Sequence, residues 1–340
     1  MNSQLLHWFE KEKRTFPWRE EITPYRVWIS EIMLQQTLAS VVVDYFERWM
    51  ARFPTISDLA RASEEEVIKA WEGLGYYSRA RNIHKTAKRL VNEHGGKLPS
   101  DRAALETLPG LGPYTVGAIL SFAFKKRAVA IDGNVIRVLS RYYGIEDIVD
   151  RTPVKRMMTE RLLGDLPASD PHVAMEALIE LGALVCKKNP QCHRCPLQEG
   201  CVAHKKGNAA TLPRKKPRVK GTHLHRLVFL LHFEGKYHLR QGAKGAVMEG
   251  LYEFPYHEGG HPFIDVETVG KKILQTWGIE ATFDRSLEMI AHTFTRFKAH
   301  LYPAIWHVTT PPTQGLWVTR DEIATLPFSS GHRKLLPHLR

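Results

Sequence analysis

The sequence predicts a multidomain chain whose two regions differ in fold class, an all-α region over residues 1–204 and an α+β region over residues 223–340. Three observations support this division. Apolar residues recur at helical spacing through almost all of the first region, with short glycine or proline breaks and hardly any alternating runs. All four cysteines lie at its end, within one 16-residue window. After a basic linker over residues 205–222, strand-like runs replace the helical spacing.

Helical segments and glycine-rich turns alternate in the first region. The spacing predicts helices that begin at Glu64–Glu66 and that cover residues 154–163 and 174–186. Two Gly-Leu-Gly turns, at 73–75 and 110–112, each separate two helical segments, and Pro113 fits the first turn of a new helix. Such a turn exposes backbone N–H groups that bind a phosphate oxygen, because glycine lets the oxygen approach. A tight turn between two packed helices explains the same pattern.

The second region begins with a predicted hairpin. Residues 224–233 and 236–239 have strand character, and Glu234–Gly235 connect them. A helix is predicted over residues 266–277, and residues 297–308 return to strand character. This mixture of strands and helices predicts an α+β domain.

The charge pattern gives only weak support for a nucleic-acid partner. Lysine and arginine exceed aspartate and glutamate by 48 to 36, which gives a formal net charge of +12. Seven of these cations lie, without any acid, in the tract Lys205–Lys220. The tract is typical of a solvated linker, and attraction for phosphate is a second reading. Specific motifs must therefore carry any argument for DNA.

Composition and the N-terminal residues exclude several other classes. With 43% hydrophobic and 25% charged residues, the chain is an ordinary globular protein and not a disordered or disulfide-dominated one. Its least charged stretch, residues 27–43, carries too many polar side chains for a membrane span. The first eight residues lack the basic flank and apolar run of a signal peptide, so we expect a cytoplasmic protein without membrane contact.

All four cysteines belong to one C-x5-C-x2-C-x5-C pattern. They are Cys186, Cys192, Cys195 and Cys201. Disulfides are disfavoured because the chain shows no secretory signal. Structural zinc sites usually combine two close pairs, whereas here one close pair is flanked by single cysteines. Four thiolates in a compact loop favour a [4Fe–4S] cluster, and zinc is the alternative. The loop would present Lys187, Lys188 and Arg194 to an anion.

Two carboxylates have contrasting settings. Glu31 is the sole charge between Arg26 and Asp44, so we expect it on an apolar helix, desolvated, with a raised pKa. Asp132 follows the apolar run 128–131 and precedes a helical pattern, so it fits a helix N-cap that stays ionised. A protonated acid and an ionised carboxylate together suit the cleavage of a glycosidic bond. A surface glutamate and a plain helix cap are the alternative interpretations.

These residues and their neighbours resemble the MutY-type adenine DNA glycosylases, a family of the helix–hairpin–helix superfamily that also contains endonuclease III. The resemblance covers nearly the whole chain. It rests on the cysteines, on a second domain after a linker, and on the segments 24–37 (PYRVWISEIMLQQT), 73–77 (GLGYY), 108–115 (LPGLGPYT) and 131–135 (IDGNV). It implies that adenine paired with 8-oxoguanine, and also with guanine, is removed from double-stranded DNA. Hydrolysis of the N-glycosidic bond would leave an abasic site.

The resemblance also assigns roles to single residues. Glu31 would protonate adenine and Asp132 would stabilise the cationic deoxyribose, while Tyr114 and Asn134 hold Asp132 and the sugar. The adenine pocket would be lined by Arg14, Trp18, Arg19, Leu34 and Glu176. The duplex around the lesion would be wedged by Gln36, Thr37, Leu74 and Tyr76, and a phosphate would be held by Gly110 and Gly112. The four cysteines would hold the [4Fe–4S] cluster.

Tyr114 distinguishes between subfamilies. Bifunctional relatives carry a lysine at this position, whose amine forms a Schiff base with the sugar before the strand is cut. Tyrosine cannot form this bond, so we expect a monofunctional glycosylase, and the family resemblance implies a monomer. Three alternatives remain: a related glycosylase with another base specificity, a non-catalytic binder of damaged DNA, and a nucleotide-pool hydrolase.

The second region resembles the Nudix-like domain of the family, with the sequence GLYEFP at 250–255. Residues 266–272 lack the paired acids of a Nudix metal site, so hydrolysis of nucleoside triphosphates is not expected. The loop 292–296 would instead recognise 8-oxoguanine through Phe294, Thr295 and Arg296. Two features depart from the family pattern. The first cysteine loop is one residue shorter than the usual C-x6-C, and Phe-Thr-Arg replaces the usual Phe-Ser-His, so we expect an altered preference for 8-oxoguanine over guanine.

Overall fold

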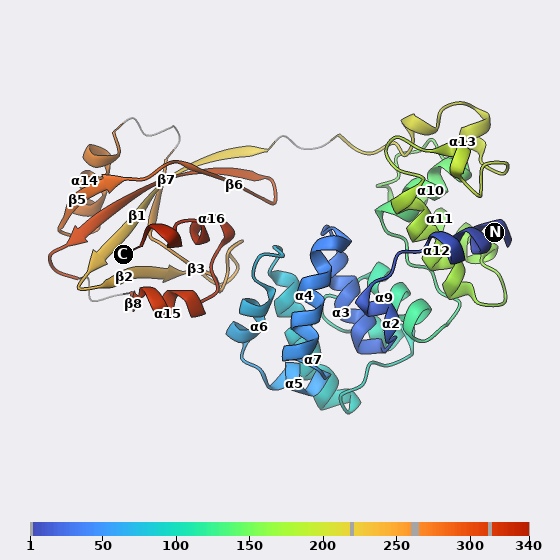
Figure 1. Cartoon of the computed structure of the whole chain (residues 1–340), viewed down its shortest axis with the longest axis horizontal. Helices are drawn as coiled ribbons and strands as arrows, with labels where there is room; N and C mark the ends of the chain where they lie inside the picture. Colours follow the sequence, from blue (N-terminus) through green and yellow to red (C-terminus); the bar gives the residue numbers. More distant parts are fainter. Residues whose placement is uncertain (1–2, 218–220, 260–264, 312–314, 340) are drawn as a thin grey trace. The chain divides into compact units, whose positions relative to one another are not determined.

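The structure is a computed structural model that describes residues 3–217, 221–259, 265–311 and 315–339 (Figure 1). By their contacts, the residues divide into two compact units. The helical unit comprises residues 1–61 and 82–217, and the sheet unit comprises residues 62–81 and 218–340. No helix among the described residues is long and apolar enough to cross a membrane.

The helical unit consists of short helices joined by tight turns. They are α1 (Ser3–Glu12), α2 (Pro17–Glu20), α3 (Pro24–Leu34), α4 (Ala39–Arg52), α5 (Ile56–Arg61), α8 (Arg102–Glu106), α9 (Pro113–Ala118), α10 (Gly133–Tyr142), α11 (Thr152–Asp165), α12 (Pro171–Leu184) and α13 (Val202–Lys205). The helix α7 (Ser78–His94) begins in the sheet unit and ends in the helical unit. Prolines in the first turn fix the start of α3, α9, α11 and α12. The predicted turn at 110–112 and the predicted helices over 154–163 and 174–186 are confirmed.

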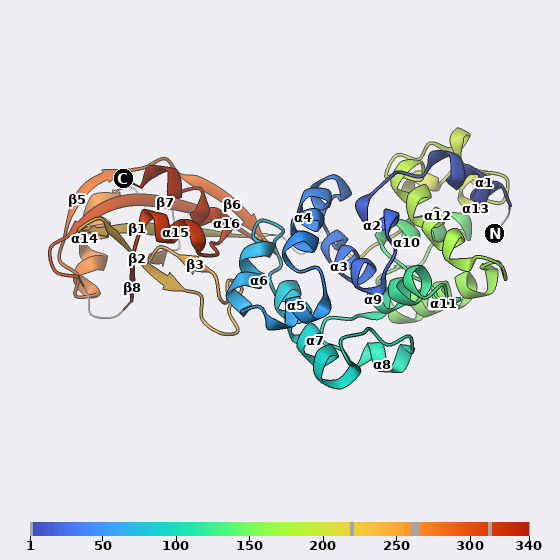
Figure 2. The same cartoon turned by 60° about the horizontal axis from the view of Figure 1, so that its bottom comes forward.

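Helix α3 is withdrawn from water along most of its length. Figure 2 shows it between α4 and α9, and it packs against both. Eight of its eleven residues are buried, and Trp28, Ile29 and Met33 are at most 1% exposed. A carboxyl group on this helix therefore sits in an apolar environment.

Two glycines let neighbouring segments approach more closely than a side chain would allow. A Cβ atom at Gly117, in α9, would lie 1.9 Å from the carbonyl oxygen of Val129, so α9 rests on the segment that leads to Asp132. A Cβ atom at Gly182, in α12, would lie 2.6 Å from the Cβ atom of Asn134, in the first turn of α10. These two close approaches fix where α10 begins relative to α9 and α12.

The sheet unit contains a mixed eight-stranded sheet. Its strands are β1 (Thr222–Phe233), β2 (Lys236–Gln241), β3 (Tyr252–Glu253), β4 (Tyr256–Gly259), β5 (Ala281–Ser286), β6 (Ile290–Phe294), β7 (Phe297–Val308) and β8 (Leu316–Thr319). The strand order is β3-β2-β1-β7-β5, with β4 beside β1, β6 beside β7 and β8 beside β2. Strands β1 and β7 pair in parallel from Thr222–Phe297 to His232–His307. The predicted strand 297–308 is confirmed, and so is the hairpin, whose turn residues Glu234 and Gly235 both have positive φ.

Alternate side chains of β1 enter two separate cores. Leu227, Phe229 and Leu231 pack with residues of α14 (Val266–Thr276). Val228 and Leu230 pack with Ile323 of α15 (Arg320–Thr325) and with the last described residues of the chain. Strand β1 is thus buried on both faces, which explains why its apolar run shows no alternation.

Helix α6 (Glu64–Trp71) and the turn after it belong to the sheet unit. The hydroxyl of Ser63 accepts a hydrogen bond from the backbone N–H of Glu66, whose carboxylate accepts one from the N–H of Ser63. This capping box fixes the start of the helix at Glu64, as predicted. The Gly-Leu-Gly turn at 73–75 separates α6 from α7, also as predicted.

Residues 205–217 of the predicted linker pack on the helical unit. Ala209 and Leu212 are buried beside two of the cysteines. Arg141 Nε donates to the carbonyl oxygen of Leu212 at 3.1 Å, and the backbone N–H of Val149 donates to that of Arg214 at 3.0 Å. The helical unit therefore extends to Pro217 and not only to residue 204, because these apolar side chains are buried in it. Residues 218–220 of the linker lie outside the described residues.

Candidate active site

Glu31 projects from α3 into a buried cluster of titratable groups. Its residue is 7% exposed. Burial raises the pKa of Glu31 from 4.5 to about 7, and a hydrogen bond from Tyr114 opposes the rise. The negative charges of Asp132 and Glu176 raise the pKa further, so all these groups lie within electrostatic reach of one another. The predicted desolvation of Glu31 is confirmed.

Tyr114 stands in the first turn of α9, which packs against α3. Its hydroxyl donates a hydrogen bond to Glu31 Oε2 at 2.5 Å. Burial raises the pKa of Tyr114 well above 10, and the carboxylates of Glu31 and Asp132 raise it further, so the phenol remains a proton donor. The resemblance implied that Tyr114 holds Asp132. The structure gives its hydrogen bond to Glu31 instead, because α9 lies on α3.

Asp132 is the N-cap of α10. Its Oδ1 accepts a hydrogen bond from the backbone N–H of Val135 at 2.7 Å, and its Oδ2 accepts one from Asn134 Nδ2 at 2.9 Å. The predicted cap is therefore confirmed. Burial also raises the pKa of Asp132 and outweighs the hydrogen bonds that lower it. Burial thus raises the pKa of both Glu31 and Asp132.

Arg137 anchors the start of α10, a role that no pattern in the sequence indicates. Its Nη2 donates to Asn134 Oδ1 at 2.8 Å and to the carbonyl oxygen of Gly182 at 2.7 Å. Its Nε donates to the carbonyl oxygen of Cys186 at 2.6 Å. Arg137 therefore fixes the side chain of Asn134, which in turn donates a hydrogen bond to Asp132. An arginine one turn after a helix cap is too common for its position alone to predict such a bridge.

A second polar cluster lies beside Glu31. Arg19 pairs with Glu176 at 3.3 Å and with Glu180 at 2.8 Å, and Arg14 pairs with Glu180 at 2.9 Å. Burial raises the pKa of Glu176, while Arg19 lowers it. Glu180 is 1% exposed and was not among the predicted residues. Its signal was present, since Glu176 and Glu180 are successive acids, one turn apart, on the otherwise apolar helix α12.

Aromatic rings complete this cluster. Trp18 is buried and stacks on Phe16 with a centroid distance of 4.7 Å. The guanidinium groups of Arg14 and Arg19 lie 5.0 and 5.4 Å from the same Phe16 ring. Leu34, the last residue of α3, is half-buried. The Phe16 ring, which was not among the predicted residues, lies beside Arg14, Trp18 and Arg19. Glu176 joins this group through its ion pair with Arg19.

The comparisons with known proteins agree with this geometry. Residues 29–163, which include Glu31, Tyr114 and Asp132, match the model of the HhH-GPD superfamily of base excision DNA repair proteins. Residues 227–338 match a NUDIX domain model. An adenine DNA glycosylase of Buchnera aphidicola (subsp. Schizaphis graminum) is 30% identical over 88% of this chain and 86% of its own length. The chain belongs to the adenine DNA glycosylase family.

The matches differ in how much of each relative or solved structure they cover. The adenine DNA glycosylase of Rattus norvegicus is 42% identical over 62% of this chain, but that match spans only 43% of the rat protein. A thermostable thymine-DNA glycosylase has a TM-score of 0.55 at 27% identity, over 60% of this chain and 94% of that chain. Endonuclease III in a non-covalent DNA complex has a TM-score of 0.51 at 26% identity, over 61% and 99%. One fold therefore carries different base specificities.

The residues expected to wedge the duplex occupy two turns. Gln36 and Thr37 follow Gln35, the C-cap of α3, and Gln36 is exposed with a φ of 59°. Leu74 and Tyr76 belong to the turn between α6 and α7, in the sheet unit; Leu74 is 7% exposed and Tyr76 45% exposed. The predicted phosphate site at Gly110–Gly112 forms the turn before α9, where Gly110 has a φ of 77°. A Cβ at Gly110 would lie 2.7 Å from that of Asn82, so only glycine fits.

The expected lesion-reading residues form a hairpin turn and not a loop of five residues. Phe294 ends β6, and only Thr295 and Arg296 lie between β6 and β7. Thr295 has a φ of 48°, and the carbonyl oxygen of Arg296 accepts a hydrogen bond from the N–H of Thr222 at 3.0 Å. The guanidinium of Arg226 lies 5.7 Å from the Phe294 ring. Cross-strand pairing of β6 with β7 shortens the turn.

The four cysteines line one pocket. All four thiols are free, and Arg141 Nη1 donates to Cys186 Sγ at 3.3 Å. Burial raises the pKa of Cys195 to about 11, and the three other thiols add to the rise, so four thiolates would require positive charge among them. Within the described ranges, no three His, Cys, Asp or Glu side chains could hold a single metal ion.

Proposed function

We propose that the chain excises adenine paired with 8-oxoguanine, and with guanine, from double-stranded DNA. The observation that carries the proposal is the buried cluster of Glu31, Tyr114 and Asp132. It puts a carboxyl group with a pKa of about 7 within electrostatic reach of a carboxyl group held by a helix N-terminus. A glycosidase needs such a pair, one group as acid and the other to face the sugar.

The chemistry follows from the two protonation states. Protonated Glu31 donates its proton to adenine as the bond between the base and deoxyribose breaks, so adenine leaves as a neutral base. Asp132, whose oxygens accept hydrogen bonds from the Val135 N–H and from Asn134, would carry the negative charge that stabilises the cationic sugar. Water then adds to C1′ of the sugar and returns a proton to Glu31. Asn134 and Arg137 keep the Asp132 carboxylate in position.

The position of Tyr114 supports a monofunctional reaction. Its phenol is engaged with Glu31 and has no amine with which to attack the sugar. We propose that strand cleavage is not part of the reaction and that the product is an abasic site. From the family resemblance, we propose that the chain acts on DNA as a monomer.

The remaining residues suggest how substrate is chosen. The cluster of Arg14, Trp18, Arg19 and Glu176 would receive the extrahelical adenine by stacking and hydrogen bonds, with Leu34 beside it. Gln36, Thr37, Leu74 and Tyr76 would fill the opened stack, and Gly110 and Gly112 would bind a phosphate. Phe294, Thr295 and Arg296 would read the oxidised guanine. We propose that residues 205–222, of which 205–217 pack on the helical unit, connect a catalytic region to this reading region.

We also propose that the cysteines hold a [4Fe–4S] cluster. Their thiols line one pocket, and Arg141 donates a hydrogen bond to the thiol of Cys186. When bound, the cluster would fasten the loop 186–201. Iron and acid-labile sulfide analysis of the purified protein tests this, with about four irons per chain expected. One zinc per chain would contradict it.

The proposed activity is tested by single-turnover release of adenine. We expect fast release from a duplex with adenine opposite 8-oxoguanine, slower release opposite guanine, and none opposite thymine. Asp132→Asn should abolish release and leave duplex binding largely intact. Release of thymine or an oxidised pyrimidine would instead indicate a different base specificity, and binding without any release would indicate a damage binder. Strand nicks before alkali treatment would contradict a monofunctional reaction.

A further inference from the structure

The turn that carries Leu74 and Tyr76 is stiff within itself. Gly73, Gly75 and Tyr76 all have positive φ, and Tyr76 adopts it at the cost of strain that glycine would avoid. Arg79 holds this conformation, because its Nη2 donates to the carbonyl oxygens of Leu74 and Gly75, both at 3.1 Å. Its guanidinium also lies 5.6 Å from the Tyr76 ring. Trp71, the last residue of α6, also donates its Nε1–H to the carbonyl oxygen of Gly75 at 3.1 Å, so the position of the turn depends on what α6 is attached to.

The residue just before this turn, Glu72, is attached to the C-terminal part of the sheet unit. Its Oε1 accepts a hydrogen bond from the backbone N–H of Phe328 at 2.7 Å. Its Oε2 pairs with Arg333 of α16 (Ser330–Arg333) and with Lys69 at 3.1 Å. The Glu72 side chain is 9% exposed, so these charge-assisted bonds are largely shielded from water.

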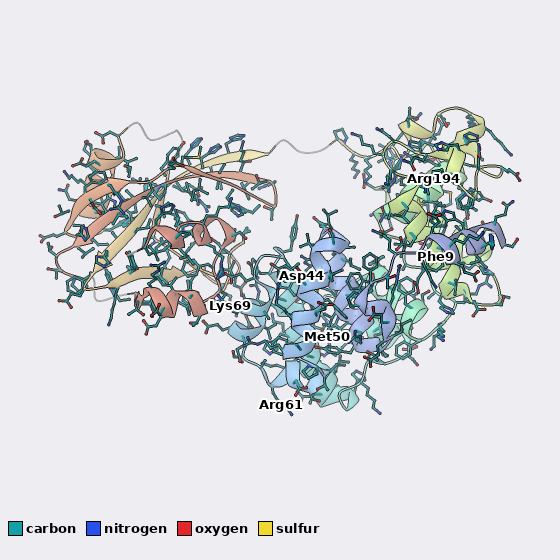
Figure 3. All side chains as sticks on the ribbon, viewed as in Figure 1. Phe9, Asp44, Met50, Arg61, Lys69 and Arg194 are labelled. Atoms are coloured by element: carbon teal, nitrogen blue, oxygen red, sulfur yellow. The ribbon has the colours of Figure 1, made fainter. Side chains whose placement is uncertain are left out.

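Helix α6 has further bonds to the same part of the chain. Lys69, labelled in Figure 3, donates to the carbonyl oxygens of Ala324 and Leu326, both at 2.8 Å, at the end of α15. Beyond the turn, Arg81 Nη1 donates to the carbonyl oxygen of Glu249 at 2.7 Å. These bonds bracket the turn on both sides along the sequence.

The segment that receives Glu72 is itself part of the sheet core. Phe328 is fully buried and packs on Phe254 with a centroid distance of 5.8 Å. The carbonyl oxygen of Pro327 accepts from the N–H of Tyr252 in β3 at 2.8 Å. Phe294, at the lesion-reading turn, packs against the same core. A displacement of Glu72 would thus have to disturb a packed core.

We propose that Glu72 is a positioning residue that fastens the Leu74–Tyr76 turn to the sheet core. This turn and the turn at Phe294–Arg296 would then meet DNA as one body. The inference rests on the proposed function for the roles of the two turns. Glu72 touches no reacting group. Its loss would therefore weaken recognition of the lesion-containing duplex and leave the bond-breaking step unchanged.

The test compares Glu72→Gln, Arg333→Gln and their double variant with Glu64→Gln, an exposed glutamate of the same helix, in the full-length protein. We expect Glu72→Gln to raise the enzyme concentration for half-maximal adenine release opposite 8-oxoguanine about tenfold. The maximal single-turnover rate should stay within about twofold. Glu64→Gln should match the wild type, and the double variant should be no worse than Glu72→Gln, because both changes remove one interaction.

Hydrogen exchange gives a second measurement that is independent of activity. The amides of residues 73–77 and 327–329 should both lose protection in Glu72→Gln and in Arg333→Gln, with no change in Glu64→Gln. Unchanged exchange at 73–77 in both variants, or a fall in maximal rate without a change in the half-saturating concentration, would overturn the inference. If the wild type releases no adenine, the proposed function fails, and the exchange data still decide whether Glu72 fastens the turn.

Discussion

Burial of Glu31 has opposite consequences for stability and for chemistry. An ionised carboxylate is disfavoured among Trp28, Ile29 and the other buried side chains of α3, and the pKa rises from 4.5 to about 7. The same rise keeps a proton on Glu31 near neutral pH, where a general acid needs it. The burial of Glu31 therefore destabilises the folded state at alkaline pH and favours the protonated form that a general acid needs near neutral pH.

The first prediction concerns stability. The folded pKa of Glu31 lies above its unfolded value, so its contribution is fully present below about pH 4.5 and is lost as the pH rises toward 7. Glu31→Gln should therefore raise the free energy of unfolding at pH 8 relative to wild type, by on the order of 3 kcal/mol. Below about pH 4.5 the difference should vanish. Denaturant unfolding at both pH values measures this, and a pH-independent difference would contradict it.

The second prediction concerns the pH dependence of adenine release at limiting enzyme. The rate should fall as the pH rises above about 7, because Glu31 must be protonated. The hydrogen bond from Tyr114 lowers the pKa of Glu31, so Tyr114→Phe should move this fall to higher pH. Rates measured between about pH 5.5 and 9 on one duplex decide the matter. A shift to lower pH in the variant would show that Tyr114 does not act on Glu31 in this way.

At the scale of the element, Gly117 and Gly182 let α9 and α12 pack closely against the segment where α10 begins. The third prediction is that Gly117→Ala destabilises the protein by about 1–3 kcal/mol, because its methyl group would meet the Val129 carbonyl. It should also slow adenine release, since α9 would move away from Asp132. Gly164→Ala in α11 is the control, because a Cβ there meets nothing within 4 Å. Thermal unfolding and single-turnover rates of both variants would test the contrast; equal effects would refute it.

Sequence predicted those elements whose ends carry local signals. The start of α6 follows from Ser63 and Glu66, the start of α10 from Asp132, and the β1–β2 turn from Glu234–Gly235. Glu31 was found because a charge in an apolar run is rare. Glu180 obeys the same rule on α12 and could have been found by it.

Other features have no local signature. Helix α6 joins the sheet unit because Lys69 and Glu72 bond to backbone groups some 250 residues further along the chain. Nothing near residue 70 indicates those partners. The net upward shift of the Asp132 pKa likewise depends on burial by distant segments, whereas the cap itself is local. Bonds between distant segments are decided by packing, which a single sequence does not display.

At the scale of the whole molecule, the basic tract is less uniform than its composition suggests. Lys206 and Arg214 pair with Glu146 at 3.6 and 3.0 Å, so part of the tract is neutralised within the helical unit. Lys205 and Lys215 are exposed. The described part of the tract therefore offers DNA fewer cations than it contains.

The fourth prediction follows from this difference. Replacing Lys205 and Lys215 with glutamine should weaken duplex binding equally for every opposite base, since bonds to phosphate do not read sequence. Each lysine replaced should reduce the slope of log affinity against log salt by about 0.9. Arg214→Gln should act mainly on thermal stability. Binding isotherms at several salt concentrations and thermal unfolding measure the two effects, and a base-dependent change in affinity would assign the lysines another role.

The first strand of the sheet begins at a residue that is bonded to the turn between β6 and β7. Thr222, the first residue of β1, donates its N–H to the carbonyl oxygen of Arg296. Any pull along the chain that precedes Thr222 would act first on this bond, and through it on the turn between β6 and β7. Shortening the chain ahead of Thr222 should therefore loosen this turn before it disturbs the rest of the sheet, which would make the length of that segment a means of tuning the proposed contact with an oxidised base.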